Sequence, residues 1–406
     1  MEKAATIKTS PALYRNVNFV LLWTGQFISQ VGDRLAMVAF PWLIYGSTHS
    51  AFSTGAMFAL YTLPYVLFGT LAGAFIDRLD KRRVMVAADI ARAGLVLAVP
   101  FVADRSLAGV YVLAFVISSV AVLFDPCKLA ILPDLVTKAK LMRANSLLAT
   151  GETLTETVGY ALAGFIVYYL ARKVVFGIDA ATFVVSALAL LAMRYAAPLR
   201  EATELTAQNL GREMREGLSF LRQHAGLLAN TVLVVASIIG IGAVYPLTFL
   251  FAVRVLHGGT AAFGIMEASL GAGFFVGSLL MAALGNRVRK GVAMTAGLAL
   301  MGGSLTTVAV CTSLAVVVVP IFVAGAANAA VLISIDTYFQ QAVPEELRGR
   351  LWGTRFTITQ TVYAASVLAG GALAAVFPVA PLFIAAGLVT AVPGLVGLFV
   401  PRVRDV

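Results

Sequence analysis

Long apolar segments alternate with short polar links along the whole chain. Twelve such segments can be distinguished, and each is long enough for an α-helix to cross about 30 Å of hydrocarbon. The pattern therefore predicts an all-α membrane protein with twelve transmembrane helices. The expected spans are residues 17–45, 52–76, 84–103, 107–132, 142–170, 174–196, 226–254, 261–285, 291–310, 314–342, 351–377 and 380–400.

The composition excludes an ordinary soluble protein. Hydrophobic residues make up 60% of the chain and charged residues only 12%, and the mean hydropathy is +0.91. A soluble protein of this size would need far more polar surface. The chain is therefore expected to lie in a lipid bilayer.

The positive charges have a one-sided distribution. The net charge is +10, and most lysines and arginines lie at the termini or in the links on one side of the predicted membrane. Only Arg105, Arg172, Lys173 and Arg254 fall on the opposite side. By the positive-inside rule, both termini are expected in the cytoplasm, with the protein in the inner membrane. No basic patch interleaved with aromatic residues indicates a nucleic-acid partner.

One long polar link divides the chain into two halves. Within it, Leu210, Met214, Leu218 and Leu221 keep a helical period, which predicts an amphipathic helix on the inner membrane surface. The expected domains are a six-helix bundle over residues 1–196, a cytoplasmic linker over 197–225 and a second six-helix bundle over 226–406.

The two halves share landmarks at a nearly constant spacing, which indicates a duplication of six helices. The offsets are 205, 208 and 211 residues. The matching landmarks are Phe40-Pro41-Trp42 with Tyr245-Pro246-Leu247, Gly69 with Gly277, Lys81-Arg82 with Arg289-Lys290, Asp125 with Asp336, and Pro133 with Pro344.

The stretch from Gly69 to Arg83 combines a small-residue helix face with a dense charge cluster. Gly69 and Gly73 are four residues apart and so share one face of a helix. The pattern that ends in the charge cluster resembles the loop between the second and third helices of the major facilitator superfamily. That family usually has glycine where this chain has Asp80.

The resemblance extends over the whole chain. It is similar to the small bacterial branch of macrolide, siderophore and lysophospholipid exporters in three stretches: Phe19 to Gln26 with Gly32-Asp33, Leu132 to Val136 with Arg143-Ala144-Asn145, and Val343-Pro344 with Arg348-Gly349-Arg350. The resemblance implies the major facilitator fold, with two pseudo-symmetric bundles around a substrate cavity. It also implies an alternating-access exporter of an amphipathic small molecule, drug- or siderophore-like, that acts as a monomer.

The family resemblance also assigns a role to the loop between the second and third helices. It implies that Asp77 caps the eleventh helix near Leu351 while the inner side is closed. The whole stretch would then act as a conformational latch. Its members are Gly69, Gly73, Asp77, Arg78, Arg82 and Arg83.

An ion gradient is the expected energy source, because no Gly-x-x-x-x-Gly-Lys-Ser/Thr motif for a nucleotide occurs. Carboxyl groups within spans are where protons would act, because a carboxylate is costly to keep ionised in hydrocarbon. No organic cofactor or metal is expected. The candidate carboxyls are Asp33, Asp125, Glu152, Glu156, Asp179, Glu267 and Asp336.

Asp33, Glu152 and Glu156 are the predicted proton-coupling residues. Asp33 lies in the middle of the first span, and its alternative role is a structural partner for Lys128 or Arg92. Glu152 and Glu156 are four apart, so they share a face and repel each other when both are ionised. The alternative for this pair is a polar contact between helices.

Other acids have expected structural roles. Asp125 lies one turn before Lys128, and Asp89 one turn before Arg92, toward the cytoplasmic ends of their spans. Local ion pairing, or snorkelling of the cations, is expected for both. The symmetry of Asp125 with Asp336 suggests matched contacts at the inner gate. Asp179 is expected to cap the sixth span or act as a structural acid near its outer start.

The fifth span carries a weak antiporter signature. In the stretch from Gly159 to Gly164, Tyr160 stands where the family signature has proline. Close packing by small residues explains the same spacing. The prediction of export therefore depends on the branch resemblance and not on this motif.

Several polar and aromatic side chains are expected to line a cavity, and alternatives to an exporter stay open. These alternatives are an uptake symporter, a lysophospholipid flippase and a non-transporting sensor or scaffold. An enzyme is not expected, since Gly-x-Ser-x-Gly and His-Glu-x-x-His motifs do not occur. The candidate lining residues are Gln26, Gln30, Tyr61, Tyr245, Asn328 and Gln360.

We expect Asp77→Asn to slow the transport cycle without abolishing substrate binding, because the latch acts on the conformational step. Substrate binding and flux measured on the same purified variant would test this. Equal loss of binding and of flux would contradict the latch.

Overall fold

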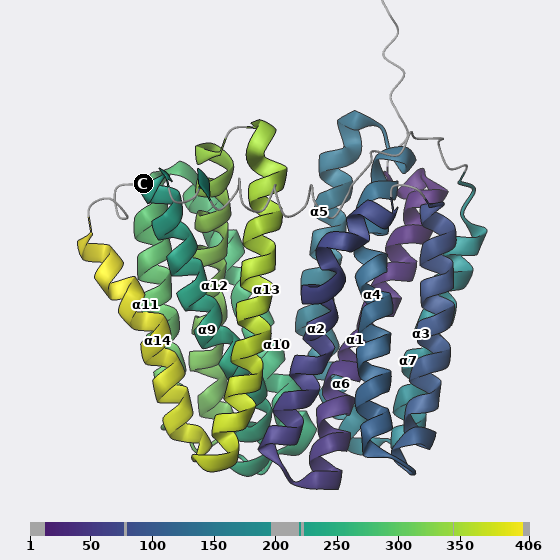
Figure 1. The fold of residues 1–406 in the computed structure, drawn as a ribbon, viewed down its shortest axis with the longest axis horizontal. Coiled ribbons are helices and arrows are strands. Elements are labelled where there is room, and N and C mark those ends of the chain that lie inside the picture. Colours follow the sequence, from purple (N-terminus) through teal and green to yellow (C-terminus); the bar gives the residue numbers. More distant parts are fainter. Residues whose placement is uncertain (1–12, 77–78, 196–218, 221–222, 344, 401–406) are drawn as a thin grey trace, which may run out of the picture.

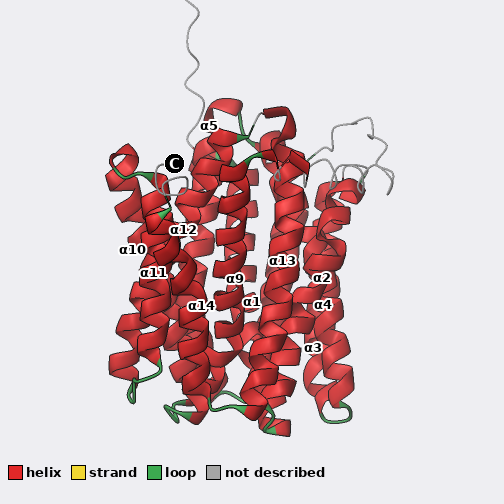
Figure 2. Ribbon diagram, turned by 60° about the vertical axis from the view of Figure 1, so that its left-hand side comes forward, coloured by secondary structure: helices red, strands yellow, loops and turns green. Residues whose placement is uncertain are grey.

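The computed structural model describes residues 13–76, 79–195, 219–220, 223–343 and 345–400. Over these ranges the regular elements are all helical, and they run side by side (Figure 2). Asp77, Arg78 and most of the linker, including the predicted amphipathic positions Leu210, Met214, Leu218 and Leu221, lie outside the described residues.

The first half crosses the molecule six times. Its fifth crossing consists of α5, a π-helical turn η2 and α6, which follow one another without a break. The elements are η1 (Leu13–Arg15), α1 (Val17–Thr48), α2 (Ala51–Ile76), α3 (Lys81–Ala103), α4 (Leu107–Leu135), α5 (Lys138–Leu154), η2 (Thr155–Gly159), α6 (Tyr160–Tyr169) and α7 (Arg172–Ala192).

The second half also crosses six times, so the described residues contain the twelve predicted crossings. Ten described helices are long and apolar enough to span a membrane. The remaining crossings are α1, which carries several polar residues, and the divided fifth one. The elements are α9 (Ala225–Arg254), α10 (Gly259–Leu284), η3 (Gly285–Arg287), α11 (Lys290–Val308), α12 (Leu314–Ala342), α13 (Glu345–Val376) and α14 (Val379–Phe399).

Three helix starts lie three or more residues before the expected boundaries, and the fifth span begins at Lys138 instead of residue 142. The third span begins at Lys81, and the Asp80 side chain caps it by accepting a hydrogen bond from the Arg83 amide at 3.2 Å. The residue that departs from the family pattern therefore has a structural role. The eleventh span begins at Glu345, so the prediction of a helix start near Leu351 was wrong, and Leu351 is buried within α13.

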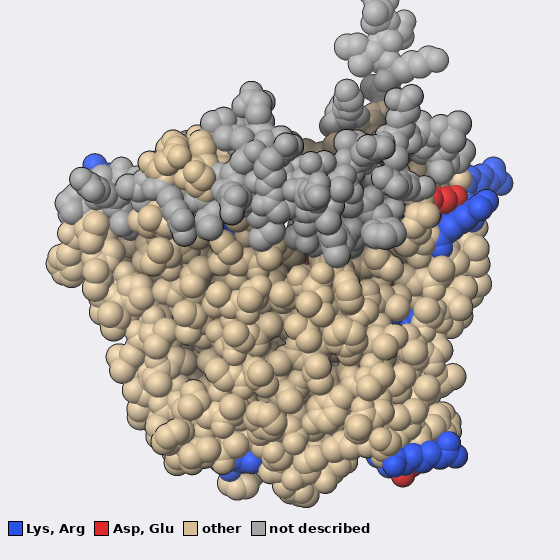
Figure 3. Space-filling model, viewed as in Figure 1, with Lys and Arg blue, Asp and Glu red and all other residues tan. Residues whose placement is uncertain are grey.

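The halves lie side by side, with α1–α7 in purple to teal and α9–α14 in green to yellow (Figure 1). We call the side where α1 begins and α14 ends the terminal side, and the opposite side the far side. Helix α2 packs against α13, and α6 packs against α10, across the boundary between the halves. The middle of the face in Figure 3 is almost entirely uncharged, as a lipid-facing surface requires.

Glycines bring the two halves into backbone contact toward the far side. A Cβ atom added at Gly55 of α2 would overlap the Cα of Gly371 in α13. A Cβ added at Gly164 of α6 would lie 2.8 Å from the Cα of Gly264 in α10. The Thr260 hydroxyl also donates a hydrogen bond to the Gly164 carbonyl at 3.1 Å. Small residues therefore let the halves close tightly here.

Arg254 of the second half adds side-chain contacts to this closure. The Arg254 guanidinium donates to the Tyr45 hydroxyl at 2.9 Å and to the His49 carbonyl at 3.2 Å. Tyr45 and His49 belong to the end of α1 in the first half. The far side of the boundary is therefore closed by both backbone and side-chain contacts.

We expect Gly371→Leu to separate α2 from α13 on the far side, because the new side chain would overlap Gly55. Spin labels placed at Phe52 and Phe377, both about half exposed, should move apart in double electron–electron resonance. Gly303→Leu is the matched control, since a Cβ there meets no atom within 4 Å. An unchanged distance distribution in Gly371→Leu would contradict tight closure.

Candidate functional site

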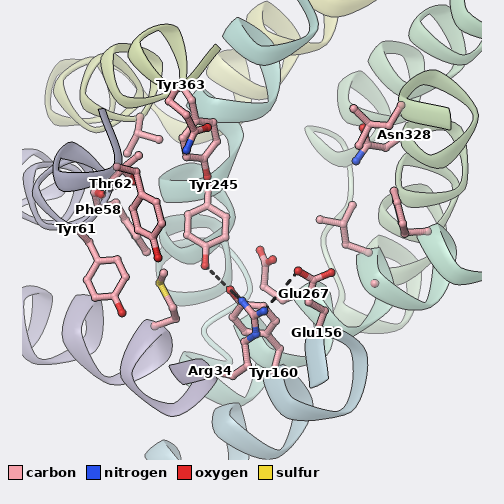
Figure 4. Close-up of a pocket in the computed structure, with 18 residues that line it drawn as sticks. Arg34, Phe58, Tyr61, Thr62, Glu156, Tyr160, Tyr245, Glu267, Asn328 and Tyr363 are labelled. Carbon is pink, nitrogen blue, oxygen red and sulfur yellow. Dashed lines mark hydrogen bonds and ion pairs between the residues drawn. The ribbon is translucent and has the colours of Figure 1, made fainter. Parts of the chain in front are cut away.

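A cavity of about 600 Å³ lies between the two halves (Figure 4). We call it the central cavity. It is lined from both halves by α1, α2, η2 and α6 on one side and by α9, α10, α12 and α13 on the other. Four of the candidate lining residues lie on its wall: Tyr61, Tyr245, Asn328 and Gln360.

A chain of polar side chains crosses the floor of the central cavity (Figure 4). Arg34 lies 3.4 Å from a Glu156 carboxylate oxygen and donates to the Tyr160 hydroxyl, also at 3.4 Å. The Tyr160 hydroxyl in turn lies 2.7 Å from the Tyr245 hydroxyl. Because Tyr245 belongs to α9, this chain links an ion pair of the first half to the second half.

Glu267 of α10 contributes a second carboxyl to this cavity. Its residue is only 5% exposed, and it interacts electrostatically with Glu156 and Arg34. In the part of the chain that the structure describes, Glu267 forms no hydrogen bond or ion pair. The sequence indicated this residue as a candidate carboxyl without placing it among the predicted proton-coupling residues.

Aromatic rings form much of the remaining wall. Phe58 and Tyr245 meet edge to face with their centroids 4.8 Å apart, and Tyr61, Tyr65 and Tyr363 lie nearby on the lining. Rings of this kind provide apolar area together with polar hydroxyl groups. The cavity is therefore suited to a molecule with both apolar and polar parts.

A second cavity of about 440 Å³ lies within the first half and shares Arg34, Tyr61 and Glu156 with the central one. We call it the side cavity. It contains the remaining candidate lining residues and most of the candidate charged groups. These are Gln26, Gln30, Asp33, Asp125, Lys128 and Glu152.

Asp33 forms an ion pair with Arg92 at the wall of the side cavity. The Arg92 side chain is only 5% exposed, and its guanidinium lies 4.0 Å from the centroid of the Phe183 ring. The predicted local pair of Asp89 with Arg92 was therefore wrong. Arg92 turns toward α1, and the structural partner considered for Asp33 is present.

Glu152 and Glu156 both face the side cavity, but each is paired with a different cation. Glu152 lies 2.7 Å from the Lys128 ammonium, whereas Glu156 contacts Arg34. Lys128 also lies 3.3 Å from Asp125, which agrees with the pair expected from their spacing. The two glutamates are therefore not a stacked pair that shares one proton.

The symmetry-related acids Asp125 and Asp336 each have a cation partner, but the partners differ. Asp125 pairs with Lys128 of its own helix α4. Asp336 of α12 accepts a hydrogen bond from Arg355 of α13 at 2.9 Å. The two contacts are thus similar in charge and different in the helices that they join.

The sequence profile of the transmembrane secretion effectors matches residues 8–405. The chain belongs to this family of major facilitator transporters. Its members move molecules across membranes, so the chain is a multi-pass membrane transporter and not an enzyme.

Two relatives with similar sequences are efflux proteins. Macrolide efflux protein A of Streptococcus pyogenes is 26% identical over 380 residues, which cover 89% of each chain. The multidrug efflux pump Tap of Mycolicibacterium fortuitum is 24% identical over 385 residues, which cover 92% of this chain and 93% of the relative.

Solved structures support the fold. The nucleoside transporter NupG aligns with a TM-score of 0.76 at 13% identity, covering 94% of this chain and 99% of its own. An inward-facing bacterial homologue of the iron transporter ferroportin aligns with a TM-score of 0.71 at 15% identity, covering 95% and 99%. At these identities the similarity establishes the major facilitator fold alone.

The described residues of the stretch from Gly69 to Arg83, at the end of α2 and the start of α3, contact both halves. A Cβ added at Gly69 would lie 3.3 Å from the Phe356 ring of α13, and Gly73 lies in the same helix. Arg82 donates to the carbonyls of Leu190, at 2.8 Å, and Leu191. This cation therefore binds the carboxyl end of α7, where the helix dipole favours it.

Arg83 differs from Arg82 in its surroundings. Its side chain is 87% exposed and lies 3.3 Å from Asp80, three residues earlier. An exposed pair of this kind contributes little to stability. Of the two latch arginines that the structure describes, Arg82 and Arg83, only Arg82 is thus anchored to another helix.

We expect Tyr160→Phe and Tyr245→Phe each to weaken the link between the halves, because each removes the shared hydroxyl contact. A double-mutant cycle on the free energy of unfolding in detergent should give a coupling of about 1 kcal/mol. Tyr168→Phe, at an exposed tyrosine, is the control. Additive effects of the two substitutions would contradict a direct contact.

Proposed function

We propose that this protein exports amphipathic small molecules from the cytoplasm by alternating access coupled to proton antiport. The observation that carries the proposal is the central cavity, which both halves line with aromatic and charged groups and which the glycine contacts close off toward the far side.

The charge distribution supports a cytoplasmic terminal side. The far-side links carry only Arg105, Arg172, Lys173 and Arg254, whereas basic residues are abundant on the terminal side. With this orientation in the inner membrane, the far-side contacts between the halves face the exterior. The structure then corresponds to a state that loads its substrate from the cytoplasm.

The cavity chemistry favours a neutral or cationic amphipathic substrate. Glu156 and Glu267 bring two carboxyls to the central cavity, and Arg34 is the one cation among its described lining residues. The relatives that export macrolides and several drugs agree with a substrate of this class. An anionic substrate would find only one cation there, Arg34, whose charge the Glu156 carboxylate already offsets.

Proton coupling would act through Asp33, Glu152 and Glu156. Each is ion-paired with a cation that lines a cavity: Asp33 with Arg92, Glu152 with Lys128, and Glu156 with Arg34. The side chains of Glu152 and Glu156 are about half exposed. A proton that binds the carboxylate releases the cation.

The Glu156 pair connects this release to the conformation. When Glu156 binds a proton, Arg34 loses its charged partner while it still donates to Tyr160, which contacts Tyr245 of the second half. Protonation of Glu156 would thus change the strength of the hydrogen-bond chain that joins the two halves. The latch around Gly69 and Arg82 would act on the same transition from the cytoplasmic end.

The deciding experiment is flux through the purified protein, reconstituted as a monomer in proteoliposomes. The probes are a radiolabelled macrolide and a cationic dye, each with and without an imposed pH gradient. We expect the gradient to drive probe transport. Asp33→Asn, Glu152→Gln and Glu156→Gln should reduce this drive at least several-fold, because each removes a proton-binding group.

The control and the rival functions give different results. Asp104→Asn removes an exposed acid paired with Arg172 on the far side and should leave transport unchanged. If all three cavity variants keep full gradient-driven transport, proton coupling through these acids is wrong. Lysophospholipid movement without a gradient would identify a flippase, gradient-driven uptake a symporter, and absence of any flux a sensor or scaffold.

A further inference from the structure

Two further carboxyl groups lie buried near the Asp33–Arg92 ion pair and interact electrostatically with it. Asp179 of α7 and Asp89 of α3 are both 0% exposed. Neither lines the central or the side cavity. The mechanism proposed above uses neither of them.

Asp179 packs directly against the backbone of α1. A Cβ added at Gly32, the residue before Asp33, would lie 2.6 Å from a carboxylate oxygen of Asp179. Both of its carboxylate oxygens are buried without a hydrogen-bond partner among the described residues. The helix begins at Arg172, so the prediction that Asp179 caps this helix was wrong.

Asp89 lies one turn before Arg92 on the same helix but is not bonded to it. Both of its carboxylate oxygens lack a partner with standard hydrogen-bond geometry in the described chain. Its polar neighbour is the Ser186 hydroxyl of α7, which is likewise buried and without a hydrogen-bond partner there. A hydroxyl can donate a hydrogen bond to a carboxylate or accept one from a protonated acid, so this neighbour is compatible with a protonated Asp89.

The charges in this cluster do not balance if every acid is ionised. Asp33, Asp89 and Asp179 would carry three negative charges against the single positive charge of Arg92. An unpaired carboxylate in a buried site costs several kcal/mol, and the group binds a proton instead. Arg92 is already engaged by Asp33, while its Nε atom is buried without a hydrogen-bond partner in the described structure.

We propose that Asp89 and Asp179 form a second proton-binding site, and that Arg92 exchanges between this site and Asp33. In the observed state, Asp89 and Asp179 each hold a proton and Arg92 pairs with the Asp33 carboxylate. The proposal rests on the transport function proposed above and adds a proton store to it.

The exchange conserves protons and charge. One buried carboxyl, Asp179 or Asp89, loses its O–H proton, and the same proton forms an O–H bond on the Asp33 carboxylate. Arg92 leaves Asp33 and pairs with the newly formed buried carboxylate. Since Asp33 lines the side cavity, its proton can then pass to water there.

Other charged and titratable groups face the cluster from each neighbouring helix. They influence when the exchange occurs, because they interact electrostatically with Asp33, Arg92 or Asp179. These groups are Arg34 on α1, Tyr61 and Tyr65 on α2, and Asp125 on α4.

Infrared spectroscopy of the purified protein at neutral pH tests the proton store without any substrate. We expect Asp89→Asn and Asp179→Asn each to remove one component of the protonated-carboxyl C=O band. Asparagine has the shape of a protonated aspartate, so both variants should fold, which size-exclusion chromatography would check. Asp104→Asn, at the exposed far-side acid, should leave the band unchanged.

Proton counting then tests the exchange. The double variant Asp89→Asn/Asp179→Asn should move fewer protons per radiolabelled macrolide while its affinity for the macrolide stays the same. An unchanged infrared band in both single variants would overturn the store. A lost band with an unchanged proton count would overturn the exchange. Absence of macrolide flux in the wild type would count against the transport function and leave the infrared result valid.

Discussion

The need to neutralise charge inside an apolar bundle is the constraint on which the rest of this structure depends. Removing an ion from water is costly, and only a close opposite charge offsets that cost. Arg34, Arg92 and Lys128 in the first half and Arg355 in the second each contact a carboxylate. Three of these four pairs border the side cavity. In the described chain, most of the paired charge inside the bundle therefore lies in the first half.

Most of the fold could be predicted from the sequence, because a bilayer imposes a minimum length on every apolar helix. All twelve spans lie where the hydropathy pattern indicated. The main error, the start of α13, has a physical cause. Charged residues between Glu345 and Arg350 end the apolar run, but a helix can continue beyond the hydrocarbon with its backbone hydrogen bonds intact. Hydropathy therefore reports the membrane-embedded part of a helix and not its full length.

The site was less predictable, since spacing along one helix does not identify a partner on another. The three-residue spacing of Asp125 and Lys128 indicated their contact correctly, whereas the same spacing misled for Asp89 and Arg92 because Asp33 of α1 competes for the arginine. The contact of Tyr160 with Tyr245 was also missed. The one sequence feature that pointed to this contact was Tyr160 at the proline position of the antiporter signature. Only the tertiary structure shows that its hydroxyl contacts Tyr245.

The π-helical turn η2 gives the fifth crossing a property that a regular helix lacks. A turn of this type contains one more residue than an α-helical turn, and such turns are often found at functional sites. If that surplus residue is absorbed into regular α-helix, the two parts of the crossing rotate relative to each other by about 100°. Glu152 and Gly164 lie on opposite sides of η2. A change of register at this one turn would therefore rotate the Glu152 ion pair relative to the Gly164 contact that closes the far side. The helix would not have to unfold.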